Sequence, residues 1–269
     1  MPENESRSLV AVDIGNSAAK FYLFSLDDDI ECPEPIKDAR SRLTDMTGSD
    51  WFQHVIADLV ADVDPTTVHW SIASVNDPFK TLVLDCISNY RPLDRVACLT
   101  NGNVPIRARV DQPDCVGIDR LLNAVAVAKV KSPACPAIVI DAGSAITVDC
   151  VSGDGDFLGG AILPGLQMQL SVLSKGTDQL PPLEFDHSSE KAIGASTENA
   201  IRTGVGRGAI GAIRELMASM QEQFGNDANL FFTGGDARHF HELFCNQSQH
   251  IPHLVGLGIL HAVRQMAIL

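Results

Sequence analysis

The sequence predicts an α/β fold made of two similar halves. Segments with the alternating pattern of β-strands are followed by segments with helical periodicity, as in the series 68–75, 78–90 and 95–100. This alternation is typical of a mainly parallel sheet that helices cover. In addition, an apolar strand that ends in Asp-x-Gly and leads into a second strand occurs twice, at Asp13 and at Asp141, about half the chain apart. Such an internal repeat predicts a duplicated architecture.

The first half begins with a predicted hairpin, because Val10 and Val12 alternate with smaller residues and a second β-rich run resumes after a tight turn. Farther along, the apolar residues after Asp50 fall on one helical face, and Asp50 can cap the free amide groups of that helix. The predicted order is a hairpin over 8–24, a polar segment with room for one strand over 27–50, a helix from 50, a strand over 68–75, a helix over 78–90, a strand over 95–100 and a helix over 121–130.

Lys131-Ser132-Pro133 is the predicted linker, so we expect domains at 1–131 and 132–269. Thr197 opens the longest helical pattern of the chain. The predicted order in this half is a strand over 137–140, a strand over 146–151, a strand containing the glycines 159 and 160, a turn at 164–165, a helix to 175, a helix over 197–224, a strand over 229–232 and a helix over 257–268. The glycines 204, 206, 208 and 211 are interpreted as sites of close helix packing.

The charge of the chain excludes several classes of function. Its 269 residues include 20 basic and 34 acidic side chains, for a formal net charge of −14, and 45% of the residues are apolar. An acidic surface repels phosphate backbones and anionic membranes, and no cluster of basic residues offsets it. We therefore expect a globular protein with a small-molecule substrate and with neither nucleic acid nor a membrane as a partner.

The cysteine pattern and the apolar runs indicate the compartment. The seven cysteines are odd in number, scattered, and never spaced as C-x-x-C, which argues against a disulfide framework and a zinc site. No stretch has the roughly 18 apolar residues of a membrane span, and the first residues lack the pattern of a signal peptide. A cytoplasmic protein is expected.

The turn Asp13-Ile14-Gly15-Asn16-Ser17 is a candidate phosphate loop. Its glycine lets backbone N–H groups approach an anion, and its aspartate supplies the hard oxygen that a Mg²⁺–phosphate unit binds through water. A plain Asx turn is the alternative. The second copy, beginning at Asp141, favours the phosphate loop, because two acidic hairpins on duplicated halves can grip a nucleotide from both sides. Thr233-Gly234-Gly235 adds a third glycine turn after a strand.

These three turns together resemble the actin/hexokinase/Hsp70-like ATPase superfamily. The resemblance implies duplicated ribonuclease-H-like halves, each a mixed five-stranded sheet with helices, and a cleft between them.

The segment Gly117-Ile118-Asp119-Arg120 places a carboxylate beside a guanidinium at a helix start. Asp119 can accept a proton from a substrate hydroxyl, while Arg120 orients an anionic group, which suits phosphoryl transfer. The alternative is a helix cap at Asp119 and a surface charge at Arg120.

The order of the motifs along the chain resembles that of one known family. The ordered set is similar to the type III pantothenate kinases over about Val10 to Leu260. The motifs are Asp-x-Gly-Asn-Ser at 13, Pro-x-x-x-Gly-x-Asp-Arg at 113, Asp-x-Gly-Ser-x-x-Thr at 141, Gly-Gly-x-x-x-Pro-Gly at 159, Leu-Pro at 180, Gly-x-x-Thr at 194 and Thr-Gly-Gly at 233.

The resemblance implies transfer of the ATP γ-phosphate to the primary hydroxyl of pantothenate, the first step of coenzyme A biosynthesis, by a homodimer. Asp119 would be the catalytic proton acceptor, Asp141 would bind a monovalent cation (K⁺ or NH₄⁺), and Asp13 would bind Mg²⁺ through water. The residues implied to bind ATP are Asp13, Ile14, Gly15, Asn16, Ser17, Ala18, Ala19, Lys20 and Ser144. The residues implied to bind pantothenate are Val110, Gly117, Ile118, Asp119, Arg120 and Thr197.

Four positions depart from the family pattern. Ser17 and Ser144 stand where Thr is usual and keep the hydroxyl, whereas Ile146 replaces a frequent Thr. Val110 stands where Tyr is frequent and cannot donate a side-chain hydrogen bond.

Two alternative functions are compatible with the same superfamily. One is a catalytically idle, regulatory relative like the Bvg accessory factors, against which the intact set Asp13, Asp119, Arg120 and Asp141 argues. The other is a kinase for another small alcohol or sugar, against which the Pro-x-x-x-Gly-x-Asp-Arg stretch argues.

Overall fold

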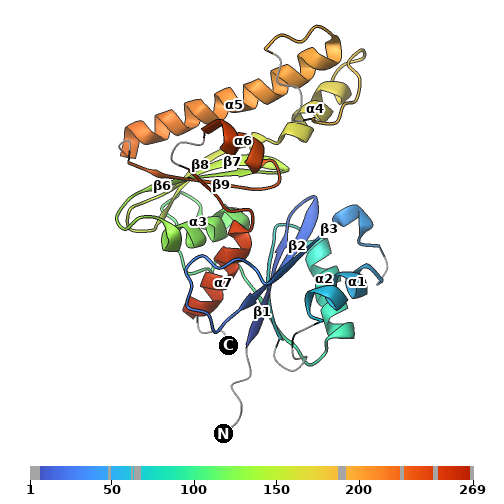
Figure 1. Cartoon of the computed structure of the whole chain (residues 1–269), viewed down its shortest axis with the longest axis vertical. Coiled ribbons are helices and arrows are strands. Elements are labelled where there is room, and N and C mark those ends of the chain that lie inside the picture. Colours follow the sequence, from blue (N-terminus) through green and yellow to red (C-terminus); the bar gives the residue numbers. More distant parts are fainter. Residues whose placement is uncertain are drawn as a thin grey trace. The chain divides into compact units, whose positions relative to one another are not determined.

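The computed structural model describes residues 7–47, 50–61, 63, 68–186, 192–224, 227–244 and 248–266 (Figure 1). Contacts divide the chain into two compact units. The first comprises residues 1–130, 155–157 and 253–269, and the second comprises residues 131–154 and 158–252. Within the described ranges, no helix is both long and apolar enough to cross a membrane.

The first unit contains a five-stranded sheet with the strand order β3-β2-β1-β4-β5. The hairpin β1–β2 is antiparallel, as predicted, whereas β4 and β5 run parallel to β1. The elements are β1 (Ser8–Ile14), β2 (Ala18–Ser25), β3 (Lys37–Arg42), the 3₁₀ turn η1 (Leu43–Asp45), α1 (Asp50–Leu59), β4 (Val68–Ser74), α2 (Asp77–Tyr90), β5 (Arg95–Cys98), the 3₁₀ turn η2 (Pro113–Cys115), α3 (Ile118–Val130) and, after the second unit, α7 (Leu254–Met266).

The second unit repeats this topology, with the strand order β10-β9-β6-β7-β8. Its central strand β6 again pairs antiparallel with the next strand and parallel with a later one, so β6 corresponds to β1 and β9 to β4. The predicted duplication is therefore confirmed at the level of strand order. The elements are β6 (Ala137–Ala142), β7 (Ala145–Val151), β8 (Phe157–Pro164), α4 (Leu166–Lys175), α5 (Thr197–Phe224), β9 (Asn229–Thr233), α6 (Ala237–Phe244) and β10 (Ser248–His250).

The central strand β1 is buried along its whole length, because helices cover both faces of its sheet. Alternate residues such as Val10 and Val12 pack in a cluster with Phe52 of α1 and Trp70 of β4. Burial of each large apolar side chain contributes about 1.5–3 kcal/mol to stability. The pleat sends the intervening residues to the opposite face of the sheet, where α3 and α7 contact the strands.

Helix α7 belongs to the first unit, although it is the last element of the chain. It packs against α3 (Figure 1), and Gly258 brings the two backbones so close that a Cβ at this position would clash with the carbonyl oxygen of Leu122. Gly256 packs in the same way on the ring of Tyr22. The sequence-based division at 131/132 assigned this helix to the second half, whereas its contacts lie with the first.

Three local predictions need correction. α3 begins at Ile118 and α7 at Leu254, each three residues before the predicted start, because Ile118 and the whole first turn of α7 are buried. The short elements α6 and β10 were not predicted. Among the described residues, Gly204, Gly208 and Gly211 of α5 are not sites of close packing, since a Cβ there would meet nothing within 4 Å, whereas a Cβ at Gly206 would make an ordinary contact with the ring of Phe185 at 3.5 Å.

Candidate functional site

The motifs of the first unit gather at one edge of its sheet. Because β1, β4 and β5 are parallel, their carboxyl ends meet at the same edge, with Ile14 opposite Ser74 and Ile72 opposite Cys98. In sheets of this kind, ligands bind at the carboxyl ends of the strands. Asp13, one residue before the end of β1, therefore lies where a ligand is expected.

The first acidic hairpin is tight and open to solvent at its tip. The N–H of Gly15 donates to the carbonyl of Ala18 at 3.0 Å, and Asn16 and Ser17 are exposed. Across the hairpin, Lys20 Nζ lies 3.3 Å from Oδ2 of the buried Asp13. A cation and a carboxylate are thus held beside a turn whose glycine leaves the backbone accessible, an arrangement suited to a metal–phosphate group.

The second acidic hairpin is one residue shorter in its loop. The N–H of Gly143 donates to the carbonyl of Ala145 at 2.9 Å, and Asp141 pairs across the strands with Thr147, where the first hairpin pairs Asp13 with Lys20. The buried Thr147 Oγ1 has no hydrogen-bond partner among the described residues. A carboxylate and an unsatisfied hydroxyl therefore lie directly opposite each other, and oxygen donors of this kind suit a hard cation.

Two glycines from other segments pack closely against the second hairpin. Gly234 has φ +98°, a left-handed conformation that favours glycine, and a Cβ there would stand 2.5 Å from Asp141 Oδ1 and clash with the carbonyl of Ala142. A Cβ at Gly165, just before α4, would likewise clash with the carbonyl of Ser144. The motifs Thr-Gly-Gly and Pro-Gly therefore have a shared role in the fold: their glycines let other segments contact the loop that begins at Asp141.

The Gly117–Arg120 segment forms the start of α3. Asp119 Oδ1 accepts a hydrogen bond from the N–H of Arg120 at 2.9 Å and lies only 2.5 Å from the place of a Cβ on Gly117. The guanidinium of Arg120 stacks on the ring of Phe157, with Cζ 5.4 Å from the centroid. Arg120 is thus an oriented, half-buried cation rather than a solvated surface charge, and Gly117 leaves the space that the carboxylate of Asp119 occupies.

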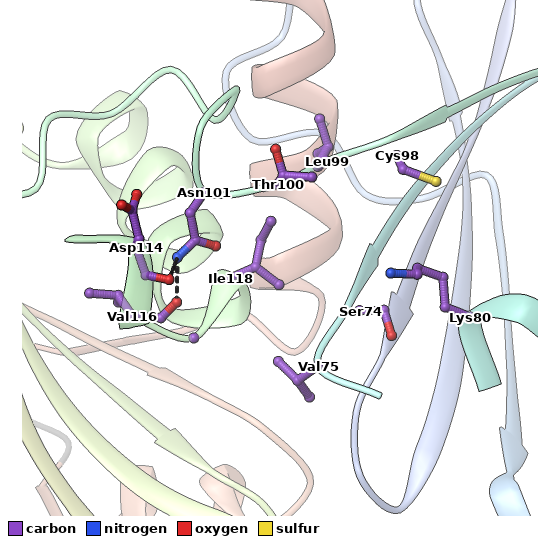
Figure 2. A pocket seen from close by; sticks show the side chains of 11 residues that line it. Ser74, Val75, Lys80, Cys98, Leu99, Thr100, Asn101, Asp114, Val116 and Ile118 are labelled. Carbon is purple, nitrogen blue, oxygen red and sulfur yellow. Dashed lines mark hydrogen bonds between the residues drawn. The ribbon is translucent and has the colours of Figure 1, made fainter. Parts of the chain in front are cut away.

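A cavity of about 310 Å³ connects this segment to the sheet edge (Figure 2). Its wall includes Ser74 and Val75 at the end of β4 and Gly117 and Ile118 at the start of α3. The remaining lining residues are Lys80, Cys98, Leu99, Thr100, Asn101, Asp114 and Val116. A pocket lined by one ammonium group, one carboxylate, two hydroxyl groups, one side-chain amide and several apolar side chains can accommodate a small polar molecule that carries aliphatic carbons.

Thr197 lies elsewhere, in the second unit. It is the first residue of α5 and is exposed, and Ser196 caps this helix by accepting the N–H of Asn199 at 3.3 Å. Gly194 packs closely on the first turn of α5, because a Cβ there would clash with backbone atoms of Asn199 and Ala200. Thr197 lines a mainly apolar groove of about 700 Å³ between α4 and α5.

Several known proteins are similar to this chain over most of its length. The family model of the type III pantothenate kinases matches residues 9–219. The type III pantothenate kinase of Rhodopirellula baltica is 33% identical over 271 residues, covering 93% of this chain and 97% of that protein. The enzyme of the same name from Dehalococcoides mccartyi strain CBDB1 is 32% identical and covers 86% of both chains. This chain belongs to the type III pantothenate kinase family.

The fold of this family member also occurs among solved structures. A Campylobacter jejuni protein of the Baf family of transcriptional activators superimposes with a TM-score of 0.60 and 21% identity, covering 97% of this chain and 100% of that chain. At this identity the likeness concerns the fold alone. The predicted fold class, two α/β halves each with a five-stranded mixed sheet, is confirmed.

Sequence reasoning missed several residues of the site. Asn101 and Lys80 line the cavity, but neither belongs to a motif of the family pattern. The only local signal was the turn-forming run Asn101-Gly102-Asn103 directly after a predicted strand. Val110, the departure from the usual Tyr, is half-buried next to Arg109, whose N–H donates to the carbonyl of Phe157 at 2.8 Å.

Proposed function

We propose that this chain phosphorylates pantothenate with ATP, giving 4′-phosphopantothenate, the first step of coenzyme A biosynthesis. Membership of the family is the observation that carries this proposal. It is supported by the two acidic hairpins and by a cavity whose wall contains the residues directly before Asp119.

Asp119 is proposed as the proton acceptor. In the reaction, the primary hydroxyl oxygen of pantothenate forms a bond to the γ-phosphorus, the bond from that phosphorus to the bridging oxygen of ADP breaks, and the hydroxyl proton passes to the carboxylate. The bond from the Arg120 N–H and the space above Gly117 support a fixed orientation of that carboxylate. Arg120, held on Phe157, orients the anionic substrate.

ATP is proposed to bind to backbone groups of the hairpins. Its phosphates would contact the loop from Asp13 to Lys20 and the exposed hydroxyl of Ser144, because these loops present N–H groups and one cation to an anion. On the acceptor side, the residues proposed to bind pantothenate are Val110, Gly117, Ile118, Asp119, Arg120 and Thr197.

Two ions are proposed to assist. No group of three or more His, Cys, Asp or Glu side chains within the described ranges is arranged to hold a metal ion, so Mg²⁺ would be held by the ATP phosphates, with Asp13 contributing through water. Asp141 would hold the monovalent cation, and the unsatisfied Thr147 hydroxyl opposite it fits an oxygen ligand set. Both ions would neutralise phosphate charge.

We further propose a homodimer in the cytoplasm. The exposed apolar side chains of Ile162 on β8 and of Met168 and Val172 on α4 are candidates for burial by a second copy. Light scattering would give the mass in solution. An enzyme that consumes ATP for coenzyme synthesis works where ATP is supplied, which favours the cytoplasm.

The test is ADP release by the purified chain with pantothenate, first with sodium and then with potassium as the only monovalent cation. We expect release that depends on pantothenate and increases with potassium. Asp119→Asn should lose about 10²–10⁴-fold in kcat while still binding ATP, because it removes the base and leaves the hairpins intact. Turnover of the wild type with a sugar but not with pantothenate would contradict the proposal, as would an unchanged kcat in Asp119→Asn.

A further inference from the structure

Asn101 makes an unusual set of contacts with a segment that follows it in the chain. Its Nδ2 lies 2.7 Å from the carbonyl oxygen of Val116 and 3.2 Å from that of Asp114 (Figure 2). It also lies 3.2 Å from the carbonyl oxygen of Pro113. One side-chain amide therefore donates to three backbone carbonyls of a single turn. The amide has two N–H groups, so one of the longer contacts is shared.

The turn that Asn101 contacts leads directly into the Gly117–Arg120 segment, which contains the proposed proton acceptor. η2 ends at Cys115, and Val116 is followed by Gly117 and then by α3, whose first turn contains Asp119. Residues 113–115 are exposed, so the turn has little apolar burial of its own. Its position therefore depends on polar contacts, and the shortest of those from Asn101 reaches the residue just before Gly117.

Asn101 is itself tied to the sheet. The Thr100 N–H donates to Asn103 Oδ1 at 2.7 Å, and Asn103 Nδ2 donates to the carbonyl of Cys98, the last residue of β5, at 3.1 Å. The N–H groups of Asn103 and Val104 also bond to the carbonyl of Thr100. These hydrogen bonds fix the position of Asn101 relative to β5. Asn101 in turn fixes the position of the turn before α3.

We infer that Asn101 is a positioning residue, which holds the Pro113–Gly117 turn so that the carboxylate of Asp119 faces the acceptor hydroxyl. Asn101 also lines the cavity, so the same contact sets the shape of the acceptor pocket. The role of Asp119 in this inference rests on the proposed function, whereas the anchoring of the turn rests on the hydrogen bonds alone.

Two substitutions at Asn101 separate positioning from simple packing. Asn101→Asp keeps the shape but places an anionic oxygen against three carbonyl oxygens, while Asn101→Ala only removes the donors. Because a displacement of about 1 Å in catalytic geometry can cost about 10²-fold in rate, we expect kcat with pantothenate to fall about 10–100-fold in Asn101→Ala and at least as far in Asn101→Asp, with the KM for ATP within about twofold of wild type. A packing role predicts the opposite order, with Asn101→Asp close to wild type.

The matched control is Asn229→Ala. The Oδ1 of Asn229 accepts the N–H of Ser132 at 2.7 Å, so this variant also loses a bond between an asparagine and a distant backbone segment. Asn229 begins β9, at the opposite end of that strand from Thr233 and Gly234. We expect its kcat and both KM values to match wild type. A loss of kcat in Asn229→Ala equal to that in Asn101→Ala would overturn the inference.

Hydrogen exchange tests the anchoring without reference to any substrate. In Asn101→Ala, the amides of Cys115 and Val116, which bond within the turn, should exchange at least about tenfold faster, and Asn229→Ala should leave them unchanged. Unchanged exchange in Asn101→Ala would refute the inference, even if the wild type is active. Faster exchange in a protein that releases no ADP with pantothenate would instead refute the proposed substrate and support the anchoring.

Discussion

Gly117→Ala is the variant for which the structure gives the sharpest expectation. A Cβ at this position would stand 2.5 Å from Asp119 Oδ1, whereas contacts of this kind ordinarily lie at 3.4 Å or more and those below 3.0 Å are essentially absent. The carboxylate must therefore retreat by roughly 0.5–0.9 Å. It can do so by rotating, because it is the far end of a flexible side chain, and the backbone need not move.

The expected result is a folded but slow enzyme. A displacement close to 1 Å costs about 10²-fold in rate, which corresponds to about 2.7 kcal/mol of transition-state stabilisation. We expect kcat with pantothenate to fall by roughly this factor, while the melting temperature stays close to that of the wild type because rotation of the half-buried Asp119 side chain relieves the clash. Steady-state ADP release and thermal denaturation on the same preparation measure both quantities.

Gly102→Ala is the matched control. A Cβ at Gly102 would meet only Thr100 Oγ1, at 4.0 Å, so no atom has to move. Its kcat should equal that of the wild type. The reasoning is refuted if Gly117→Ala retains full kcat, or if it loses activity only in proportion to the fraction that unfolds.

Three further predictions concern other parts of the molecule. Asp141→Ala should weaken the activation by potassium, measured as ADP release against potassium concentration; an unchanged activation curve would exclude Asp141 as the ligand. Gly234→Ala should lower the free energy of unfolding by at least about 1–3 kcal/mol in urea denaturation, because its φ is +98°, whereas Gly204→Ala, with open space around it on a helix, should raise it by up to about 1 kcal/mol. Burial lowers the pKa of His261, so the unfolded chain binds the proton more readily and stability should fall as the pH drops through about 6.5; the melting temperature of His261→Gln should depend less on pH between 7.5 and 5.5.

Much of the fold could be predicted from local patterns. The hairpin that contains Asp13, the helix that starts at Thr197 and the strand before Gly234 follow from periodicity and turn residues within about ten positions of each other. The recurrence of Asp-x-Gly after an apolar strand predicted the duplication, and the strand orders of the two sheets confirm it. Start positions were less accurate, because the first turn of α3 is defined by burial of Ile118 rather than by a capping residue.

The sequence by itself determined the family, the two acidic hairpins and the identity of the groups that can carry charge, because each is encoded in a short run of residues. Only the tertiary structure decided that Asn101 contacts the turn before Asp119, that Gly234 touches Asp141, and that α7 packs on α3 through Gly258. The physical reason is that hydrogen bonds and close backbone contacts between distant segments depend on where the folded chain brings them together. Periodicity, which reports only which face of one element is apolar, does not contain that information.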